Sequence, residues 1–165
     1  MTEIYRVSDY IADFIAEIGV KNVFLLPGGG SMHLVDSVGK NSNLEVVACL
    51  HEQAAAISAE AYARISENIG VAIVTSGPGA TNAITGVAGA WIESIPMMVI
   101  SGQCKRSDML RDSPLRQKGV QEVDIVKMVK SITKYAVIVE NPDDILALWR
   151  RLITQQKQGV QDLFG

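Results

Sequence analysis

Short apolar segments, each followed by a stretch with the composition of a helix, constrain the fold more than any other feature of this sequence. The apolar segments cover residues 23–26, 44–50, 71–75 and 97–101. Helical stretches follow three of them, at residues 31–38, 53–66 and 80–93. Strands without polar alternation are typical of parallel sheets that helices cover on both faces. The sequence therefore predicts an α/β fold with a mainly parallel sheet and helices on both faces.

Two further helices and a fifth strand are predicted outside this repeating pattern. Apolar residues recur at helical spacing over residues 7–18, and Gly19 follows where a left-handed residue would end the helix. Residues 134–139 have the composition of a strand. Asn141 then provides an N-cap for a last helix over residues 142–156.

Composition argues against several classes of function. With 165 residues, 48% of them hydrophobic, the chain can bury one core, so we predict a single domain over residues 1–165. The net charge is −3 and the basic residues are scattered, which argues against a nucleic acid partner. The most apolar stretch, residues 71–100, is interrupted by glycine, proline and glutamate, which favours a buried core over a membrane helix.

The N-terminus and the cysteines favour a cytoplasmic protein. Acidic residues interrupt the apolar residues of segment 1–14, unlike the continuous apolar region of a signal peptide. Cys49 and Cys104 lack the spacing of a zinc site or a disulfide framework. We therefore expect two free thiols and no metal site in this chain.

Candidate site residues directly follow the predicted strands. In an open parallel sheet, ligands bind beyond the carboxyl ends of the strands. These positions are residues 27–31, 51–53 and 76–82, together with a polar loop over residues 102–121. Because that loop is long for a connection inside a compact domain, we expect it to be functional or mobile.

Taken singly, the motifs have ordinary interpretations as well as functional ones. The glycines of residues 76–82 would let phosphate approach a helix N-terminus, but Asn82 replaces the third glycine of a dinucleotide fingerprint. A purely structural tight turn is the more favoured alternative there. Glu52 could simply offset the dipole at the start of its helix. His51 beside it is more often a hydrogen-bonded structural histidine than a catalyst.

Taken together, the motifs resemble one family. In order along the chain they are LLPGGGS, LHEQAAAISAEAYAR, TSGPGATNAITG, IPMMVISGQ, GVQEVDIV and ITKYAVIV. Over residues 3–156 this succession is similar to the N-terminal, pyrimidine-binding domain of acetolactate synthases and related thiamine-diphosphate enzymes. The resemblance implies the thiamine-diphosphate-binding fold of the pyrimidine type, whose usual last strand has no clear match near the end of this sequence.

The resemblance implies that thiamine diphosphate is the cofactor and assigns Glu52 the central role. Glu52 matches the glutamate that hydrogen-bonds the aminopyrimidine ring and so activates the cofactor for attack on a 2-oxo acid such as pyruvate. The turn that contains Gly77, Pro78, Gly79 and Asn82 is expected to lie beside the aminopyrimidine.

Two other segments match the substrate side of the family's site. The resemblance places Gly28, Gly29 and Gly30 near the reacting carbons. Gln121 matches a glutamine that faces the substrate-derived intermediate and is the second residue expected to be catalytic. Val120 departs from the phenylalanine often found before that glutamine, a position that bears on the preference for the second substrate.

In the family, Mg²⁺ and the diphosphate are held by a separate domain. That domain carries a Gly-Asp-Gly sequence followed by paired asparagines, and neither it nor the family's middle domain has a counterpart in this sequence. We therefore expect a fragment, a truncated product or half of a split enzyme. Such a chain would be inactive alone and would need a diphosphate-binding domain or subunit as its partner.

Three functional hypotheses remain open at this point. The first is the cofactor-activating part of an acetolactate synthase-like transferase of branched-chain amino acid biosynthesis. The others are the small subunit of a split 2-oxo-acid decarboxylase and a noncatalytic binding or oligomerisation module. The helices predicted at residues 53–66 and 80–93 are rich in Ala and Gly, which allow close helix approach, so we also expect a homodimer with both helices at or near its interface.

Overall fold

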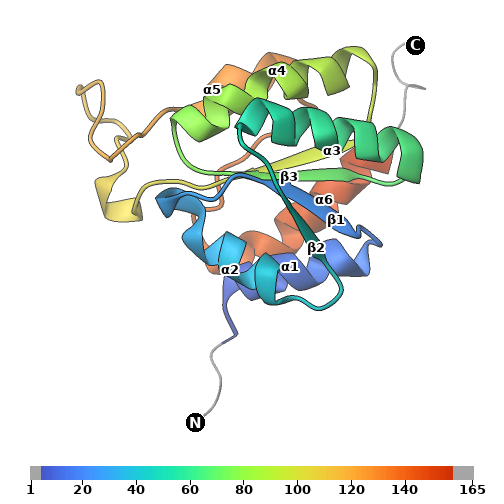
Figure 1. Cartoon of the computed structure of the whole chain (residues 1–165). Coiled ribbons are helices and arrows are strands. Elements are labelled where there is room, and N and C mark those ends of the chain that lie inside the picture. The colour runs from blue at the N-terminus through green and yellow to red at the C-terminus, as the bar shows by residue number, and fades with distance from the viewer. Residues whose placement is uncertain (1–4, 158–165) are drawn as a thin grey trace.

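Four parallel strands form the centre of the structure, a computed structural model that describes residues 5–157 (Figure 1). The strands are β1 (Asn22–Leu25), β2 (Glu45–Ala48), β3 (Gly70–Val74) and β4 (Met97–Ser101). They lie in the order β2-β1-β3-β4, and each neighbouring pair is parallel. The prediction of an α/β fold with a parallel sheet is confirmed.

Helices cover both faces of this sheet (Figure 1). One face carries α1 (Val7–Glu17), α2 (Met32–Lys40) and α6 (Ile145–Lys157), and the other carries α3 (Glu52–Ser66), α4 (Pro78–Ile92) and α5 (Ile125–Val129). Short 3₁₀ turns lie at Gly29–Ser31, Arg106–Asp108, Lys130–Ile132 and Pro142–Asp144. Among the described residues, no helix is both long and apolar enough to cross a bilayer.

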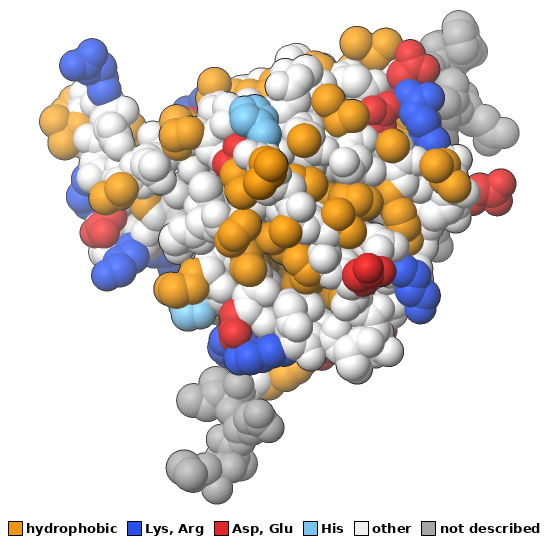
Figure 2. Space-filling model, viewed as in Figure 1, with side chains coloured by type: hydrophobic (Ala, Val, Ile, Leu, Met, Phe, Trp, Pro, Cys, Tyr) orange, Lys and Arg blue, Asp and Glu red, His pale blue; other side chains and the backbone are white. Residues whose placement is uncertain are grey.

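Hydrophobic side chains gather on the outer surface over α3 and the edge strand β2 (Figure 2). On α3 the exposed apolar residues are Ala54, Ile57, Ala61 and Ile65, which we call the α3 stripe. Their spacing of three or four residues places them along one side of the helix. The stripe is therefore a continuous apolar surface that the described residues leave open to solvent.

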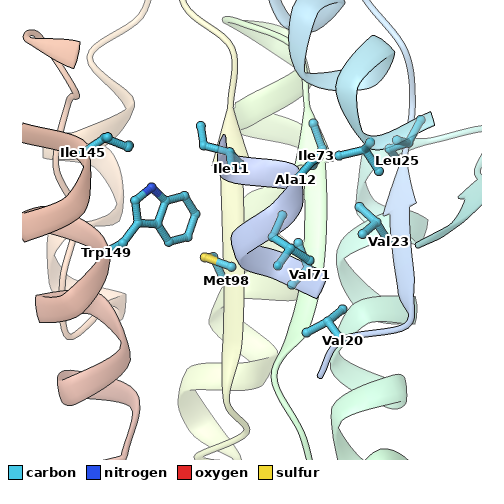
Figure 3. Close-up of a cluster of buried hydrophobic side chains, with 12 residues drawn as sticks. Ile11, Ala12, Val20, Val23, Leu25, Val71, Ile73, Met98, Ile145 and Trp149 are labelled. Carbon is cyan, nitrogen blue, oxygen red and sulfur yellow. The ribbon is translucent and has the colours of Figure 1, made fainter. Parts of the chain in front are cut away.

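The larger hydrophobic core lies between the sheet and helices α1, α2 and α6 (Figure 3). In Figure 3, Ile11 of α1 and Trp149 of α6 lie on the same side of the sheet as Val71 and Met98. The rings of Phe14 and Trp149 pack with their centroids 5.0 Å apart. Every residue of β3 is buried, which explains why its sequence lacks polar alternation.

Small residues bring α3 and α4 together on the opposite face. A methyl group at Gly86 would lie 2.5 Å from the Cβ of Ala56, so the two helices pack too closely there for any larger residue. Ala56 and Ala83 are buried in the same cluster with Val74 of β3. Much of the Ala and Gly content that suggested an intermolecular interface is therefore used inside the domain.

The predicted fifth strand is wrong. Residues 134–139 form no strand, and the sheet of the described chain has four strands. Ala136 and Ile138 are half-buried, whereas Val137 and Val139 are exposed, so side-chain packing alone produces the alternating pattern that resembled a strand. A strand also requires a ladder of backbone hydrogen bonds with a neighbour, which side-chain composition does not specify.

The helix ends follow the predicted capping residues more closely. Gly19 has φ of +86° at the end of α1, as its left-handed position requires. The side chain of Asn141 accepts a hydrogen bond from the Asp143 backbone N–H at 3.4 Å. Helix α5 was not predicted, because five residues are too few to show a helical period.

We expect the Ile15→Ala substitution to destabilise the fold by about 2–5 kcal/mol, because Ile15 is fully buried in the larger core. Urea unfolding followed by circular dichroism measures this free energy. Leu146→Ala is the matched control, since Leu146 is also helical but 45% exposed, and its cost should stay below about 1 kcal/mol. Equal costs for the two substitutions would contradict the assignment of the core.

Candidate functional site

Two glycine-containing turns meet around Thr75 at the carboxyl edge of the sheet. The backbone N–H of Gly30 donates a hydrogen bond to Oγ1 of Thr75 at 3.1 Å. A methyl group at Gly28 would lie 2.5 Å from the Cβ of Thr75, and one at Gly79 would lie 2.6 Å from its Cγ2. Thr75 thus lies between the turn after β1 and the turn after β3. Sequence analysis missed Thr75, although its position directly after a buried strand was a usable signal.

Glu52 is the buried carboxylate of this edge. It is the first residue of α3 and only 7% exposed. The side-chain amide of Asn82, on α4, donates a hydrogen bond to Oε2 of Glu52 at 3.0 Å. The close packing of α3 and α4 therefore brings together two residues that are 30 positions apart and that the family resemblance assigned to one site.

The second carboxylate oxygen of Glu52 has no protein partner. Within residues 5–157, no group donates a hydrogen bond to Oε1. A methyl group at Gly79 would lie 3.1 Å from this oxygen, so the absence of a side chain there leaves the space beside Oε1 open. Glu52 consequently presents one fixed oxygen and one free acceptor at the start of two helices.

His51, and not Glu52, caps helix α3. The Nδ1 atom of His51 accepts a hydrogen bond from the Gln53 backbone N–H at 3.1 Å. His51 is exposed and has the extended backbone of an N-cap residue. This geometry supports the structural interpretation of His51 and removes the need for the Glu52 side chain as a cap.

The loop at residues 102–121 folds back onto the turn that begins α4. Gly77 has φ of +59° and ψ of −114°, a conformation open mainly to glycine. A methyl group at Gly77 would collide with the backbone carbonyl of Gln121, so the two backbones are in direct contact. Gln121 itself has φ of +55°, and its side chain is exposed. Pro78 follows Gly77 as the exposed first residue of α4.

Gly28 and Gly29 line a separate open cavity of about 470 Å³. The other lining residues are Pro27, Met32, Val35 and Asp36. Neither Glu52 nor Asn82 lines this cavity. The expected site residues therefore form two neighbouring groups, one around Glu52 and one at the glycine turn after β1, and Thr75 lies between them.

The two cysteines and the acidic residues do not form a further reactive centre in the described chain. Cys49 and Cys104 are free, and burial raises the pKa of both thiols, which favours the protonated form. Among residues 5–157, no three His, Cys, Asp or Glu side chains are arranged to hold a metal ion.

Sequence comparison places these features in a known family. The family described as thiamine pyrophosphate enzyme, N-terminal TPP binding domain, matches residues 5–128. Thiamine pyrophosphate is another name for thiamine diphosphate. The match includes Glu52, Asn82, both glycine turns and the loop that ends at Gln121.

Several acetolactate synthases are similar to this chain. The large subunit from Buchnera aphidicola subsp. Schizaphis graminum is 37% identical over 149 residues, which make up 90% of this chain and 25% of that protein. The isozyme 3 large subunit of Escherichia coli K12 is 38% identical over 138 residues, covering 84% and 23% of the two chains. The chloroplastic enzyme of Arabidopsis thaliana is 38% identical over 138 residues, covering 84% and 20%.

The chain thus spans between a fifth and a quarter of the length of these curated relatives. The family match, in contrast, covers most of the chain. Together with the parallel α/β fold and the buried glutamate at the carboxyl edge, it shows that this chain belongs to the thiamine pyrophosphate enzymes, as a member of their N-terminal TPP-binding domain family.

Proposed function

We propose that this chain binds the aminopyrimidine ring of thiamine diphosphate and activates the cofactor through Glu52. The observation that carries this proposal is the buried Glu52 carboxylate, with Oε2 held by Asn82 and Oε1 free. A carboxylate oxygen without a protein partner can exchange a proton with a weakly basic ring nitrogen. The chain would act within an acetolactate synthase-like enzyme on 2-oxo acids such as pyruvate.

Two neighbours of Glu52 support this role. Gly79 has no side chain to fill the space beside Oε1, and Asn82 fixes the orientation of the carboxylate. When bound, thiamine diphosphate supplies a nucleophilic carbon for attack on the 2-oxo group.

The glycine turn after β1 and the loop before α5 would bind the substrate. Gly28 and Gly29 would form the wall near the reacting carbons, and their open cavity supports this role. The exposed amide of Gln121 can donate a hydrogen bond to a carboxylate or carbonyl oxygen. Its backbone contact with Gly77 supports a position for Gln121 at the edge of the proposed pyrimidine site.

The proposal includes a partner that binds the diphosphate and Mg²⁺. The relatives are four to five times longer than their match to this chain, so a further domain or subunit can supply these functions. Their acetolactate synthase activity favours this role over a split decarboxylase subunit or a noncatalytic module. It also supports a place in branched-chain amino acid biosynthesis, and the two free thiols suit the reducing environment of the cytoplasm.

We also propose that two copies of the chain associate through the α3 stripe. The stripe extends along most of α3 and is continuous with apolar surface over β2 (Figure 2). Exposed apolar patches of this kind are uncommon on soluble monomers, and two-fold pairing is the commonest way to bury them. Trp91 and Ile92 near the end of α4 are also exposed, which supports a position for α4 near the same interface.

We expect Glu52→Gln to slow hydrogen-deuterium exchange at C2 of the bound cofactor by about a hundredfold to ten-thousandfold. The amide fits the same space but cannot exchange a proton with the ring nitrogen. NMR of thiamine diphosphate bound to the chain and a diphosphate-binding partner measures this rate. Glu45→Gln is the matched control, because Glu45 is an exposed acid of β2, and should leave the rate unchanged. An unchanged rate in Glu52→Gln would sink the proposed role.

The purified chain, given thiamine diphosphate and Mg²⁺, should consume no pyruvate by itself. The described residues provide the activating carboxylate but no metal-binding cluster. Calorimetry should accordingly detect weak cofactor binding, and a pyruvate assay should detect no turnover. Turnover by rigorously purified chain would overturn the need for a diphosphate-binding partner.

Sedimentation equilibrium tests the proposed dimer. We expect the wild-type chain to be dimeric at micromolar concentration and the Ile65→Lys variant to be monomeric. Ile65 is 86% exposed within the stripe, so a lysine there would place an unpaired charge in the dimer interface. Leu146→Lys is the control on α6, which covers the opposite face of the sheet. A wild-type monomer at all concentrations, or equal effects of both substitutions, would contradict the proposed interface.

A further inference from the structure

Glu122 follows Gln121 and is the most heavily hydrogen-bonded carboxylate of the loop that reaches the site. Its Oε1 accepts a hydrogen bond from the Leu110 backbone N–H at 2.5 Å. Its Oε2 accepts from the backbone N–H groups of Gly119 at 2.9 Å and Lys118 at 3.4 Å. One side chain therefore ties together two parts of the loop that are eight or nine residues apart in sequence.

Charge strengthens this arrangement. Hydrogen bonds from backbone N–H groups to an ionised carboxylate are shorter and stronger than those between neutral groups. The N–H of Leu110 and then that of Gly119 lower the pKa of Glu122 below its ordinary value. At neutral pH the ionised carboxylate can therefore accept on both oxygens at once, which an uncharged amide cannot do.

The end of the loop also packs against its beginning. Gly119 is buried, and a methyl group there would collide with Sγ of Cys104. The ammonium of Lys118 donates a hydrogen bond to the Ser107 carbonyl at 2.6 Å. These contacts hold the two residues 118 and 119 that precede Gln121 in the chain. The Glu122 carboxylate holds the residue that follows Gln121.

Gln121 lies between these restraints in a conformation that it would seldom adopt alone. A left-handed φ of +55° is uncommon for a residue with a side chain and persists where surrounding contacts hold it. In this conformation the Gln121 carbonyl lies against the α-carbon of Gly77. Gly77 is the N-cap of α4, the helix that carries Gly79 and Asn82 to Glu52.

We propose that Glu122 is a positioning residue that holds Gln121 against the Gly77 turn by closing the loop between Leu110 and Gly119. Glu122 acts through Gln121 and has no contact with Glu52 among the described residues. The consequence for substrate binding rests on the proposed function, in which Gln121 orients the 2-oxo acid. The positioning itself is a property of the chain and can be measured without cofactor.

NMR of the isotopically labelled chain at neutral pH tests the positioning. Glu122→Gln retains the shape of the side chain but directs an NH₂ group at backbone donors. We expect amide hydrogen exchange at Leu110 or Gly119 to accelerate by roughly tenfold or more. We also expect the nuclear Overhauser contact between the Gly77 Hα and Gln121 Hβ protons, whose carbons the structure places together, to weaken or disappear.

Two variants complete this experiment. Glu122→Asp keeps the charge but is too short to span both Leu110 and Gly119, so it should weaken the same two signals. Glu17→Gln is the control, because Glu17 is an exposed acid at the end of α1, and it should change neither. Faster amide exchange in the loop with an intact Gly77–Gln121 contact would overturn the proposal. Unfolding of both Glu122 variants would also overturn it, because Glu122 would then stabilise the whole fold.

A kinetic measurement separates this inference from the proposed function. In the chain completed with a diphosphate-binding partner, Glu122→Gln should raise the KM for the 2-oxo acid severalfold and leave C2 exchange of the cofactor at the wild-type rate. Glu52→Gln should slow C2 exchange of the cofactor. It should leave unchanged both the amide exchange at Leu110 or Gly119 and the Gly77–Gln121 Overhauser contact. An unchanged KM despite a displaced Gln121 would overturn the role of Glu122 in substrate binding, whatever the result for Glu52.

Discussion

Close backbone packing at the carboxyl edge of the sheet is the constraint on which the site depends. A Cβ atom at Gly28 or Gly79 would clash with the Thr75 side chain, and one at Gly30 would clash with the Ser76 side chain. This packing joins the turn after β1 to the turn after β3 through the small side chains of Thr75 and Ser76. It therefore fixes the geometry of two glycine segments that would otherwise be among the most adaptable parts of the chain.

Small side chains also position the Glu52 carboxylate. Because Gly86 lies against Ala56, helices α3 and α4 approach closely enough for Asn82 to reach Oε2 of Glu52. His51 serves as the cap of α3, so the Glu52 carboxylate is not required for helix stability. The Glu52 oxygen that Asn82 does not hold therefore stays available to a ligand.

Sequence reasoning predicted the α/β class and the four strands, because apolar periodicity is a local property. The family resemblance assigned Glu52 and Asn82 to one site, and the structure brings the two side chains together. It failed at residues 134–139, where half-buried Ala136 and Ile138 produced a strand-like pattern without a ladder. It also missed Thr75 and Glu122. Both act through contacts between segments that are separated in sequence, and local periodicity cannot detect such contacts.

The sequence by itself determined the order of the elements, the family and the residues at the carboxyl edge, since strand ends in a parallel sheet meet there whatever the details of packing. Only the tertiary structure decided that Glu52 has one free oxygen, that Gln121 contacts Gly77 and that Glu122 closes the loop. These depend on distances of a few ångströms between residues far apart in the chain. Such distances follow from close packing of the whole domain, which no local pattern of residues encodes.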